Sequence, residues 1–451
     1  MRSTSVVAAV GCALAIAACA LDARVATVRT SSRDGGPAAG ADDDRATYCM
    51  GQGPPILVGD SAGATTVCSG RIAAKAFRYA LCTCDSLSTS DLLVTDSFSS
   101  ALGPYAPGGV SGAVGTNGAV TANGRMQVGG SLWVGGAAGV SASNLAVATD
   151  LHDEGILEGM DTISIGDEAF VDGDVTSVNL SVGGTLTLPE AATLSVTGTS
   201  QIAATARAPV TVAPPCACDA ADVVDIAGYV AAQRAFNHDA DIGLDPAALA
   251  TVTADRQLTL PCGRFYLAGV GGQGTASLTL TATGRTALFV DGDVSLRGGL
   301  DVELADGGEL DLFVGGMLIV DGPLRLGTPT EPSRLRVYVG SSLQLGQPGV
   351  IGGNLYAPTG VLAVGGGVDA YGSVFVKHLQ TAGVFSVHYD TEVLQAAARC
   401  PATDGGATSC RTCDDCGDEA CVAGVCGACA TDADCCAPLT CAAGACVASA
   451  P

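Results

Sequence analysis

The chain has 451 residues, of which 62 are glycine, and its formal net charge at pH 7 is −24. A surface this acidic repels nucleic-acid phosphates and anionic lipid headgroups, so nucleic-acid binding is excluded. Glycine at this level, with no collagen period and only 4% aromatic residues, favours an array of short strands joined by tight turns. The 20 cysteines indicate an oxidising compartment.

Residues 1–19 are predicted to be an export signal, because one arginine precedes an apolar run that ends in small residues. The last four, Ile-Ala-Ala-Cys, resemble the lipobox of bacterial lipoproteins, which implies that Cys19 carries a lipid. Ordinary signal-peptidase cleavage near Ala18 or Ala20 is the alternative. Because Ala20 follows the cysteine, the resemblance implies an outer-membrane lipoprotein, at the cell surface or on the periplasmic face. No later segment has about 18 unbroken apolar residues, so the lipid is expected to be the only membrane attachment.

Two segments precede the first regular strands. Residues 20–46 are rich in Gly, Asp and Ser, which predicts a disordered tether with an r.m.s. span of about 30 Å. Residues 47–91 contain four cysteines and are expected to form an amino-terminal cap over the open end of a repeat array. These cysteines are Cys49, Cys68, Cys82 and Cys84.

Residues 92–215 and 263–398 share one pattern, in which apolar and polar residues alternate in short runs broken by Gly or Asp-Gly. Alternation with a period of two is typical of strands with one buried face. In the second stretch an aromatic residue recurs every 18 to 25 residues, which suits one coil of a repeat. The predicted fold is therefore mainly β, a parallel β-solenoid (β-helix) in two halves with a helical insertion, a closing helix at 391–398 and a small C-terminal disulfide-rich module. The recurring aromatic residues are Phe289, Phe313, Tyr338, Tyr356 and Phe375.

Residues 216–262 are expected to form the helical insertion, with one helix from about 220 to 237. Val223, Ile226 and Val230 recur at helical spacing, and Asp219 can cap the start of the helix. We expect Cys262 to bridge Cys216 or Cys218 and so to close the base of the insertion.

The recurring aromatic residues are expected to form one outward-facing column. Each lies between two apolar neighbours, so if the neighbours fill the core, alternation directs the aromatic side chains outward. A soluble protein seldom leaves such an apolar stripe bare. The apolar face of the helix, Val223, Ile226 and Val230, is therefore predicted to contact at least two of Phe289, Phe313 and Tyr338.

Residues 399–451 form a separate module, in which too few large apolar residues are present for a core. Two pairs have the spacing of zinc ligands, but six further cysteines in an exported chain favour disulfides over metal. The run from Cys426 resembles small secreted cystine-knot-like and Dickkopf-like modules. Two sets of cysteines end alike in Cys-x-Ala-Gly-x-Cys, and spacing leaves the pairing open. The cysteines expected to form disulfides are Cys410, Cys413, Cys416, Cys421, Cys426, Cys429, Cys435, Cys436, Cys441 and Cys446.

Candidate catalytic and metal-binding residues are few. The stretch 237–241 (Asn-His-Asp-Ala-Asp) could hold a metal ion, and the Asp-Gly-Asp turns at 172–174 and 291–293 could hold calcium, but helix-end and turn chemistry explain them better. Asp301 and Glu303 are two residues apart on the solvent side of one predicted strand, where solvation explains them. The four histidines, His152, His238, His378 and His388, are far apart in sequence. We therefore predict no catalytic site, no metal and no cofactor.

Residues 351–359 (Ile-Gly-Gly-Asn-Leu-Tyr-Ala-Pro-Thr), 367–374 and the ending His-Tyr-Asp at 388–390 resemble the carboxyl end of an uncharacterised bacterial family of exported β-solenoid proteins. Similar endings occur on large pilus-assembly minor components, and the rungs resemble bactofilin-type β-helices more weakly. The resemblance implies a scaffold or adhesion element with no assigned chemistry.

The predicted function is thus that of a non-catalytic cell-envelope lipoprotein. It is held to the membrane by its lipid, with a surface polysaccharide or another envelope protein as the candidate partner. A polysaccharide-binding or polysaccharide-cleaving solenoid is the first alternative, and a filament-forming β-helix is the second.

Overall fold

The computed structural model describes residues 45–46, 48–49, 57–58, 67–68, 76–220, 223–394, 420–422, 425–442 and 445–447. Cys19, most of the predicted tether, and Cys410, Cys413 and Cys416 lie outside these residues. The predicted closing helix is described only at 391–394, which form a 3₁₀ turn.

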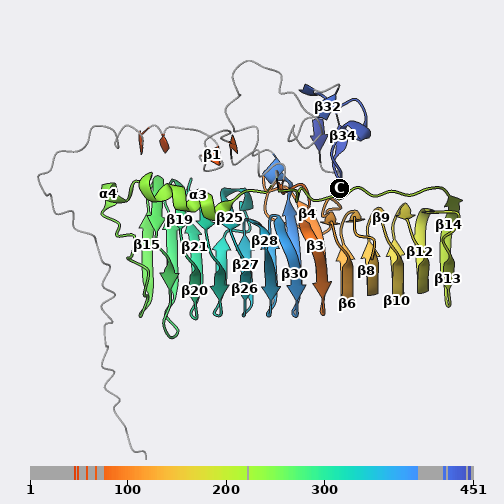
Figure 1. Ribbon diagram of the computed structural model, residues 1–451, viewed down its shortest axis with the longest axis horizontal. Coiled ribbons are helices and arrows are strands. Elements are labelled where there is room, and N and C mark those ends of the chain that lie inside the picture. The colour runs from red at the N-terminus through yellow and green to blue at the C-terminus, as the bar shows by residue number, and fades with distance from the viewer. Residues whose placement is uncertain are drawn as a thin grey trace, which may run out of the picture. The chain divides into compact units, whose positions relative to one another are not determined.

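The body is a parallel β-solenoid, as predicted, and its strands form a single 29-stranded sheet that winds around one core (Figure 1). Each coil contributes segments to three faces, which we call A, B and C. In spatial order, face A contains β15 (Arg256–Leu260), β18 (Leu278–Ala282), β21 (Leu300–Leu304), β24 (Leu324–Gly327), β27 (Gly349–Gly352), β29 (Val368–Tyr371), β31 (Phe385–Asp390), β4 (Leu93–Phe98), and parts of β6 (Val120–Val128), β8 (Val140–Val147), β10 (Leu157–Ile165), β12 (Val175–Leu188) and β14 (Ser200–Arg207).

Faces B and C follow the same order, and several long strands bend from one face to the next. Face B contains β16 (Gly263–Leu267), β19 (Arg285–Val290), β22 (Glu309–Val314), β25 (Leu335–Val339), the first parts of β28 (Asn354–Val364), β30 (Val374–Thr381) and β3 (Leu81–Thr89), then β5 (Val114–Thr116), β7 (Leu132–Val134), β9 (Leu151–Asp153), β11 (Ala169–Val171) and the ends of β12 and β14. Face C contains β17 (Val270–Gly271), β20 (Val294–Leu296), β23 (Leu318–Val320), β26 (Leu343–Leu345), the last parts of β28, β30 and β3, the first parts of β6, β8, β10 and β12, and β13 (Leu194–Val196).

The chain enters the solenoid in the middle and not at an end. Its amino-terminal half winds from β3 outward to β14, and its carboxyl-terminal half winds from β15 inward to β31. The two halves meet where β30 pairs in parallel with β3 and β31 pairs with β4. Figure 1 shows the junction, with the blue β30 beside the orange β3. We call this junction the seam.

The seam corrects the prediction of an amino-terminal cap at 47–91. Residues 81–89 form β3, an internal rung with β30 on one side and β5 and β6 on the other. The first solenoid half therefore runs from Leu81 to Arg207. It begins before the predicted residue 92 and ends before the predicted residue 215. The cysteine content of 47–91 suggested a cap, but Cys82 and Cys84 form disulfides with the segment that follows the first solenoid half.

These two cysteines hold the crossover that carries the chain from one half to the other. Disulfides join Cys82 to Cys216 and Cys84 to Cys218, each over 134 residues of sequence. The predicted bridge from Cys262 to Cys216 or Cys218 is therefore wrong, because Cys262 pairs with Cys49. The two Cys-x-Cys sequences are joined in order, the first cysteine of one to the first of the other and the second to the second.

The helical insertion contains a shorter helix than the predicted 220–237. Helix α3 (Ile226–Ala232) begins at Asp225, whose side chain accepts a hydrogen bond from Gly228 N, so Asp225 and not Asp219 is the N-cap. It continues as the 3₁₀ helix η1 (Gln233–Ala235), and α4 (Asp239–Ile242) follows. A further 3₁₀ helix, η2 (Pro332–Arg334), lies between β24 and β25. The apolar periodicity in the sequence began at Val223, but residues 223–225 precede the helix in the structure.

The insertion covers the outer edges of β16 and β17 at one end of the solenoid, while β15 pairs only with β18 in the described chain. The Asp239 carboxylate accepts a hydrogen bond from Tyr266 N, 2.9 Å away, at the outer edge of β16. Leu249 O accepts from Gly271 N at 3.0 Å and Val252 N donates to Gly271 O, which covers the edge of β17. Edge groups that would otherwise pair with another chain are thus occupied.

Three small two-stranded sheets lie outside the solenoid. β1 (Leu57–Val58) pairs with β2 (Val67–Cys68), β32 (Ala420–Val422) with β33 (Val425–Gly427), and β34 (Thr440–Ala442) with β35 (Ala445–Val447), all antiparallel. The 3₁₀ helix η5 (Asp432–Asp434) lies between the last two sheets in sequence. In the part of the chain that the structure describes, no helix is long and apolar enough to cross a membrane.

Candidate functional site

One outward-facing column of side chains follows face B from rung to rung, and it extends well beyond the predicted aromatic residues. Strand register aligns each member with the next along the solenoid axis. In spatial order the column contains Tyr266, Phe289, Phe313, Tyr338, Tyr356, Phe375, Cys82, Gly115, Trp133, His152, Phe170 and Thr187.

The first part of this column is covered, as predicted. Phe289 and Phe313 are fully buried, and the ring of Tyr229 on α3 meets them edge-on at 5.7 and 5.3 Å between centroids. Ile226 and Val230 lie on the same buried face of the helix. The ring that covers the column is thus Tyr229, which the sequence reasoning did not select, while Val223 precedes the helix.

Farther along, an extended segment and a second aromatic residue continue the cover. Val224 N donates to Tyr356 Oη at 3.3 Å, and the buried Phe77 meets Tyr356 edge-on at 6.3 Å. The Tyr389 hydroxyl donates to Phe77 O at 2.7 Å, which holds residue 77 against the body. The insertion and the chain just before β3 therefore share the work of burying the column.

A second outward column on face B carries charge and is also buried. Arg336 forms two hydrogen bonds with Asp311, at 2.5 and 3.0 Å, and both side chains are almost completely buried. Burial opposes the charge of Arg336, but its interactions with Asp311 and its neighbours outweigh burial and raise its pKa. Tyr48 lies over this column, with its ring 5.1 Å from the Arg285 guanidinium. A charged pair enclosed in this way positions chain segments and does not face a substrate.

The far part of the column forms a half-buried stack of three rings, Trp133, His152 and Phe170. The ring centroids of Trp133 and His152 are 3.6 Å apart, and those of His152 and Phe170 are 5.0 Å apart, with interplanar angles of 14° and 9°. Burial between the two aromatic neighbours lowers the pKa of His152 to about 4, so the imidazole is neutral at pH 7. We call these three residues the aromatic ladder.

The rings of the ladder pack face to face, with His152 between Trp133 and Phe170. Because the three planes are stacked nearly parallel along the solenoid axis, the faces are in contact with each other. Sugar rings bind aromatic side chains through an exposed face.

Two of the four histidines meet polar partners across the seam, although 292 residues separate each pair in sequence. On face A, His388 Nδ1 lies 2.7 Å from Asp96 Oδ1, and the Tyr105 hydroxyl donates to Asp96 Oδ2 at 2.5 Å. Elsewhere on the seam, Ser86 Oγ lies 2.5 Å from His378 Nδ1. Sequence distance concealed these pairs, which the parallel register of β31 with β4 and of β30 with β3 creates.

The Asp96–His388 pair is enclosed by aromatic rings. The His388 ring is 4.2 Å from Tyr105 and 4.7 Å from Tyr371, and the pair's side chains are only 12% and 13% exposed. Burial and the hydrogen bond to Asp96 raise the pKa of Tyr105, so its hydroxyl stays protonated. An oriented histidine of this kind can act as an acid or base, but here its neighbours chiefly join the loop at 99–110 and the two halves of the solenoid.

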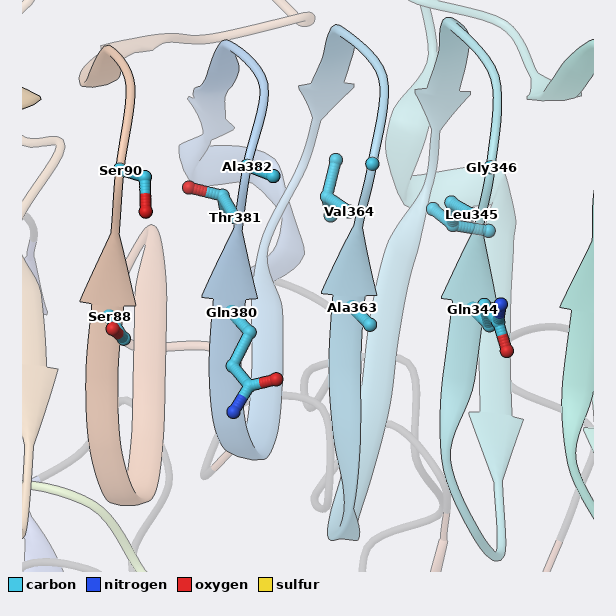
Figure 2. Close-up of a pocket in the computed structure, with 11 residues that line it drawn as sticks. Ser88, Ser90, Gln344, Leu345, Gly346, Ala363, Val364, Gln380, Thr381 and Ala382 are labelled. Atoms are coloured by element: carbon cyan, nitrogen blue, oxygen red, sulfur yellow. The ribbon is translucent and has the colours of Figure 1, made fainter.

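Face C carries a shallow groove of about 410 Å³ that also crosses the seam. Figure 2 shows its side chains along four adjacent rungs, with Ser88 from β3 beside Gln380 from β30, and Ser90 just after the end of β3. Gln344, Ala363, Gln380 and Ser88 are in register, one per rung. The lining mixes Ser, Thr and Gln side chains with Leu345, Val364 and alanines, and it contains no charged residue. It therefore offers no acid–base pair.

The predicted oxygen-rich and histidine-containing stretches are engaged in holding the backbone. His238 Nδ1 accepts from Arg264 N at 2.9 Å, beside the Asp239 contact that caps β16. In the two Asp-Gly-Asp turns, Asp174 accepts from Thr193 N at 2.7 Å and Asp293 from Met317 N at 2.7 Å. These carboxylates connect one rung to the next, which favours turn chemistry over calcium binding.

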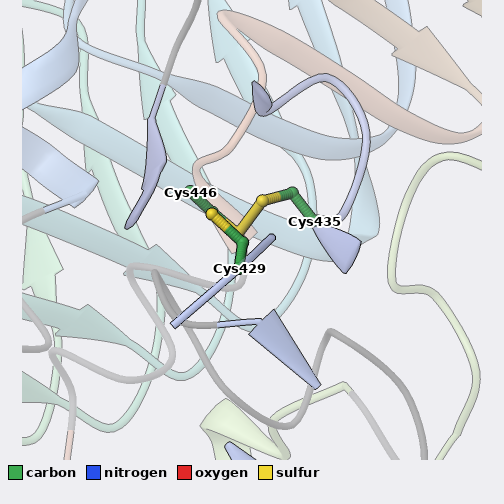
Figure 3. A group of neighbouring side chains, drawn as sticks. All are labelled: Cys429, Cys435 and Cys446. Atoms are coloured by element: carbon green, nitrogen blue, oxygen red, sulfur yellow. A yellow bond between two sulfur atoms is a disulfide. The ribbon is translucent and has the colours of Figure 1, made fainter. Parts of the chain in front are cut away.

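The cysteine-rich module contains disulfides at the described positions. Cys429 pairs with Cys441 and Cys435 with Cys446, and Cys421 and Cys436 are also disulfide-bonded. Figure 3 shows Cys429, Cys435 and Cys446 close together, the only geometric metal candidate among the described residues. Their sulfur atoms are already bonded, so they do not suit a metal ion.

The repeated Cys-x-Ala-Gly-x-Cys sequences form equivalent hairpins. Cys421 lies opposite Cys426 in β32 and β33, and Cys441 lies opposite Cys446 in β34 and β35. The internal repeat seen in the sequence is therefore a structural repeat.

A family model and a solved structure are similar to parts of this chain. A family model, a domain of unknown function (DUF7305), matches residues 222–396, less than half of the chain, and agrees with the predicted uncharacterised family. No curated protein matches the chain. Among solved structures, an ice-binding protein from an Antarctic bacterium of the Flavobacteriaceae is similar at 12% identity, over 70% of this chain and 97% of its own, with a TM-score of 0.18. A TM-score this low says nothing about function.

Proposed function

We propose that this protein is a non-catalytic, lipid-anchored scaffold or adhesion element of the bacterial cell envelope. In this proposal Cys19 carries the lipid, the solenoid is a rigid spacer, and the partner is another envelope protein or a surface polysaccharide.

The observation that carries the proposal is the disulfide between Cys49 and Cys262. It joins the segment that follows the proposed tether to the capped end of the solenoid. Arg45 supports the same attachment, because its Nε donates to Cys262 O at 2.9 Å and its guanidinium is 3.6 Å from Asp241. The chain that leads back to Cys19 therefore starts from one end of the body.

The position of this disulfide gives the solenoid a near end and a far end. Thirteen segments are stacked on face A from β15 to β14. Twelve steps of about 4.8 Å place the far end about 58 Å from the near end. A solenoid anchored at its near end can reach about 58 Å beyond the end of the tether, a length that suits a spacer or adhesion element.

The polysaccharide alternative has less support from the outer surface. In the aromatic ladder the rings stack on each other, which leaves fewer ring faces for sugars, and the groove on face C has no paired carboxylates. For polysaccharide cleavage, the candidate acid–base pair among the described residues is Asp96 and His388.

The anchor is tested by palmitate labelling of cells that express Cys19→Ser. We expect labelling to be lost and the protein to leave the membrane fraction. Cys12→Ser, a matched change within the same leader, should leave both unchanged. Labelling that persists in Cys19→Ser would refute the lipid anchor.

The role is tested with the same strains. If the protein is an adhesion or scaffold element, cells with Cys19→Ser should lose surface attachment or envelope integrity to the level of a deletion strain. A glycan array with a reducing-sugar assay tests the alternative. Hydrolysis that disappears in Asp96→Asn would overturn the non-catalytic proposal.

A further inference from the structure

The segment 45–49, which we call the strap, is joined to the near end of the solenoid by a disulfide between Cys49 and Cys262. Both cysteines are half-buried, whereas Cys82 and Cys216 of a crossover disulfide are at most 5% exposed. Thiol–disulfide exchange requires that a thiolate reach one of the two sulfur atoms. A dissolved thiol therefore reaches the disulfide of the strap more readily than this crossover disulfide.

The strap covers polar groups whose hydrogen bonds it does not complete. The Tyr48 ring lies over two guanidinium groups, with its centroid 5.6 Å from Cζ of Arg264 and 5.1 Å from Cζ of Arg285. The Tyr48 hydroxyl and Arg285 Nε are buried and have no hydrogen-bond partner among the described residues. Burial also raises the pKa of the Tyr48 hydroxyl and lowers the pKa of Arg285. A buried polar group without a partner costs free energy, which is regained when water can reach the group.

The noncovalent contacts described for the strap are few. Arg285 Nη1 donates to Tyr48 O at 3.2 Å. Arg45 Nε donates to Cys262 O at 2.9 Å, and the same guanidinium is 3.6 Å from the Asp241 carboxylate. The side chains of this ion pair are 26% and 16% exposed, and water weakens a pair that it can reach. Because the buried unpartnered groups oppose these contacts, the position of the strap depends on its disulfide.

Beyond the strap, the chain is fixed to the solenoid at the seam. The next described residues that the solenoid buries are Ala76 and Phe77, and Phe77 O accepts a hydrogen bond from the hydroxyl of Tyr389 in β31. Strand β3 follows and is the seventh of thirteen segments on face B, so six steps of about 4.8 Å, about 29 Å, separate it from either end. The strap therefore attaches the preceding chain to one end of the solenoid, whereas Phe77 attaches it to the middle.

We propose that the disulfide between Cys49 and Cys262 is a redox-sensitive clasp that determines where the tether leaves the solenoid. A dithiol opens it by exchange: the dithiol is oxidised to its disulfide, and two electrons and two protons pass to Cys49 and Cys262, which become thiols. The strap then leaves the body, water reaches Tyr48 and Arg285, and the attachment point moves from the near end to the seam. In an anchored protein the solenoid changes from end-on to side-on attachment, and this last consequence alone rests on the proposed function.

The test uses the secreted Cys19→Ser protein in solution and follows trypsin cleavage after Arg45 by mass spectrometry. Dithiothreitol is added at a concentration that leaves the fluorescence of Trp133 unchanged, so that the solenoid stays folded. We expect reduction to speed the cleavage by about tenfold or more, because proteolysis follows the population of the released strap. Iodoacetamide should label Cys49 and Cys262 before the cysteines of the crossover.

Three variants separate the disulfide from the other contacts of the strap. Cys49→Ser combined with Cys262→Ser should be cleaved as fast as the reduced protein without any dithiol. Cys429→Ser combined with Cys441→Ser removes a disulfide of the C-terminal module and should leave the slow cleavage unchanged. Tyr48→Phe removes the buried hydroxyl, so in the reduced protein it should favour the docked strap and slow the cleavage by about threefold or more.

Three results would overturn the inference. The first is cleavage after Arg45 that stays slow in the reduced protein, which would show that noncovalent contacts alone hold the strap. The second is faster cleavage of reduced Tyr48→Phe than of the reduced parent protein, since the hydroxyl would then favour docking. The third is a loss of hydrogen-exchange protection in residues 81–89 on reduction, because β3 must stay paired with β30 for the seam to hold the chain. Failure of the palmitate-labelling test would refute the anchor and leave all three measurements unaffected.

Discussion

The two crossover disulfides should stabilise the fold in a strongly non-additive way. Cys82–Cys216 and Cys84–Cys218 each close a loop of 134 residues, and they lie side by side. In the chain-entropy model, closing one loop of this size stabilises by about 5 kcal/mol at 25 °C. Once one bond is present, the other closes a loop of only a few residues, for which the same model gives about 2 kcal/mol.

We therefore expect the loss of one disulfide to cost much less than half of what the loss of both costs. Removing either pair by Cys→Ala substitution should lower the free energy of unfolding by about 2 kcal/mol, because the remaining bond still closes the long loop. Removing both should lower it by about 7 kcal/mol. The coupling in this double cycle arises in the unfolded state and does not need any contact to change in the folded one.

Trp133 provides the readout, because it is the only tryptophan and its rung is next but one to that of Cys82. Its fluorescence can be followed through guanidinium unfolding of the oxidised wild type, both single-pair variants and the four-cysteine variant. Single-pair variants that each lose about 5 kcal/mol and add without coupling would refute this reasoning. So would a four-cysteine variant as stable as the wild type.

The remaining predictions concern one buried acid and the covering helix. Asp153 is fully buried, accepts a hydrogen bond from Gly155 N at 3.0 Å, and has its pKa raised to about 7 by burial. Because the folded protein holds this proton more tightly than the unfolded chain, its contribution is complete below about pH 4 and is lost as pH rises to about 7. Asp153→Asn should remove that pH dependence and stabilise the protein at pH 8 by up to about 4 kcal/mol, and an unchanged profile of unfolding free energy against pH would contradict this. Tyr229→Ala should weaken the packing of α3 by about 2–4 kcal/mol and speed proteolysis at 226–232. Ala231→Ser, a change at an exposed position of the same helix, should do neither. Equal cleavage of the two variants would show that Tyr229 does not hold α3 against the aromatic column.

Much of the solenoid could be predicted because its signals are local. Alternation in 300–304 or 335–339 requires only that one side of a strand be buried, and glycine or Asp-Gly turns follow from backbone sterics. The outward direction of Phe289 and Phe313 followed from their apolar neighbours in the same way. The need for a cover over these rings was equally evident from their size.

The order of the rungs was decided only by the tertiary structure. Every rung presents the same backbone edge, so nothing local indicates that Phe375 lies beside Cys82 or that the chain enters at the middle. The disulfide partners, the His388–Asp96 pair and the identity of Tyr229 as the covering ring all depend on that order. The repeat in the sequence determines the structure of each coil. Which coils are neighbours is decided by contacts between segments hundreds of residues apart, because any two coils can pair through the same backbone hydrogen bonds.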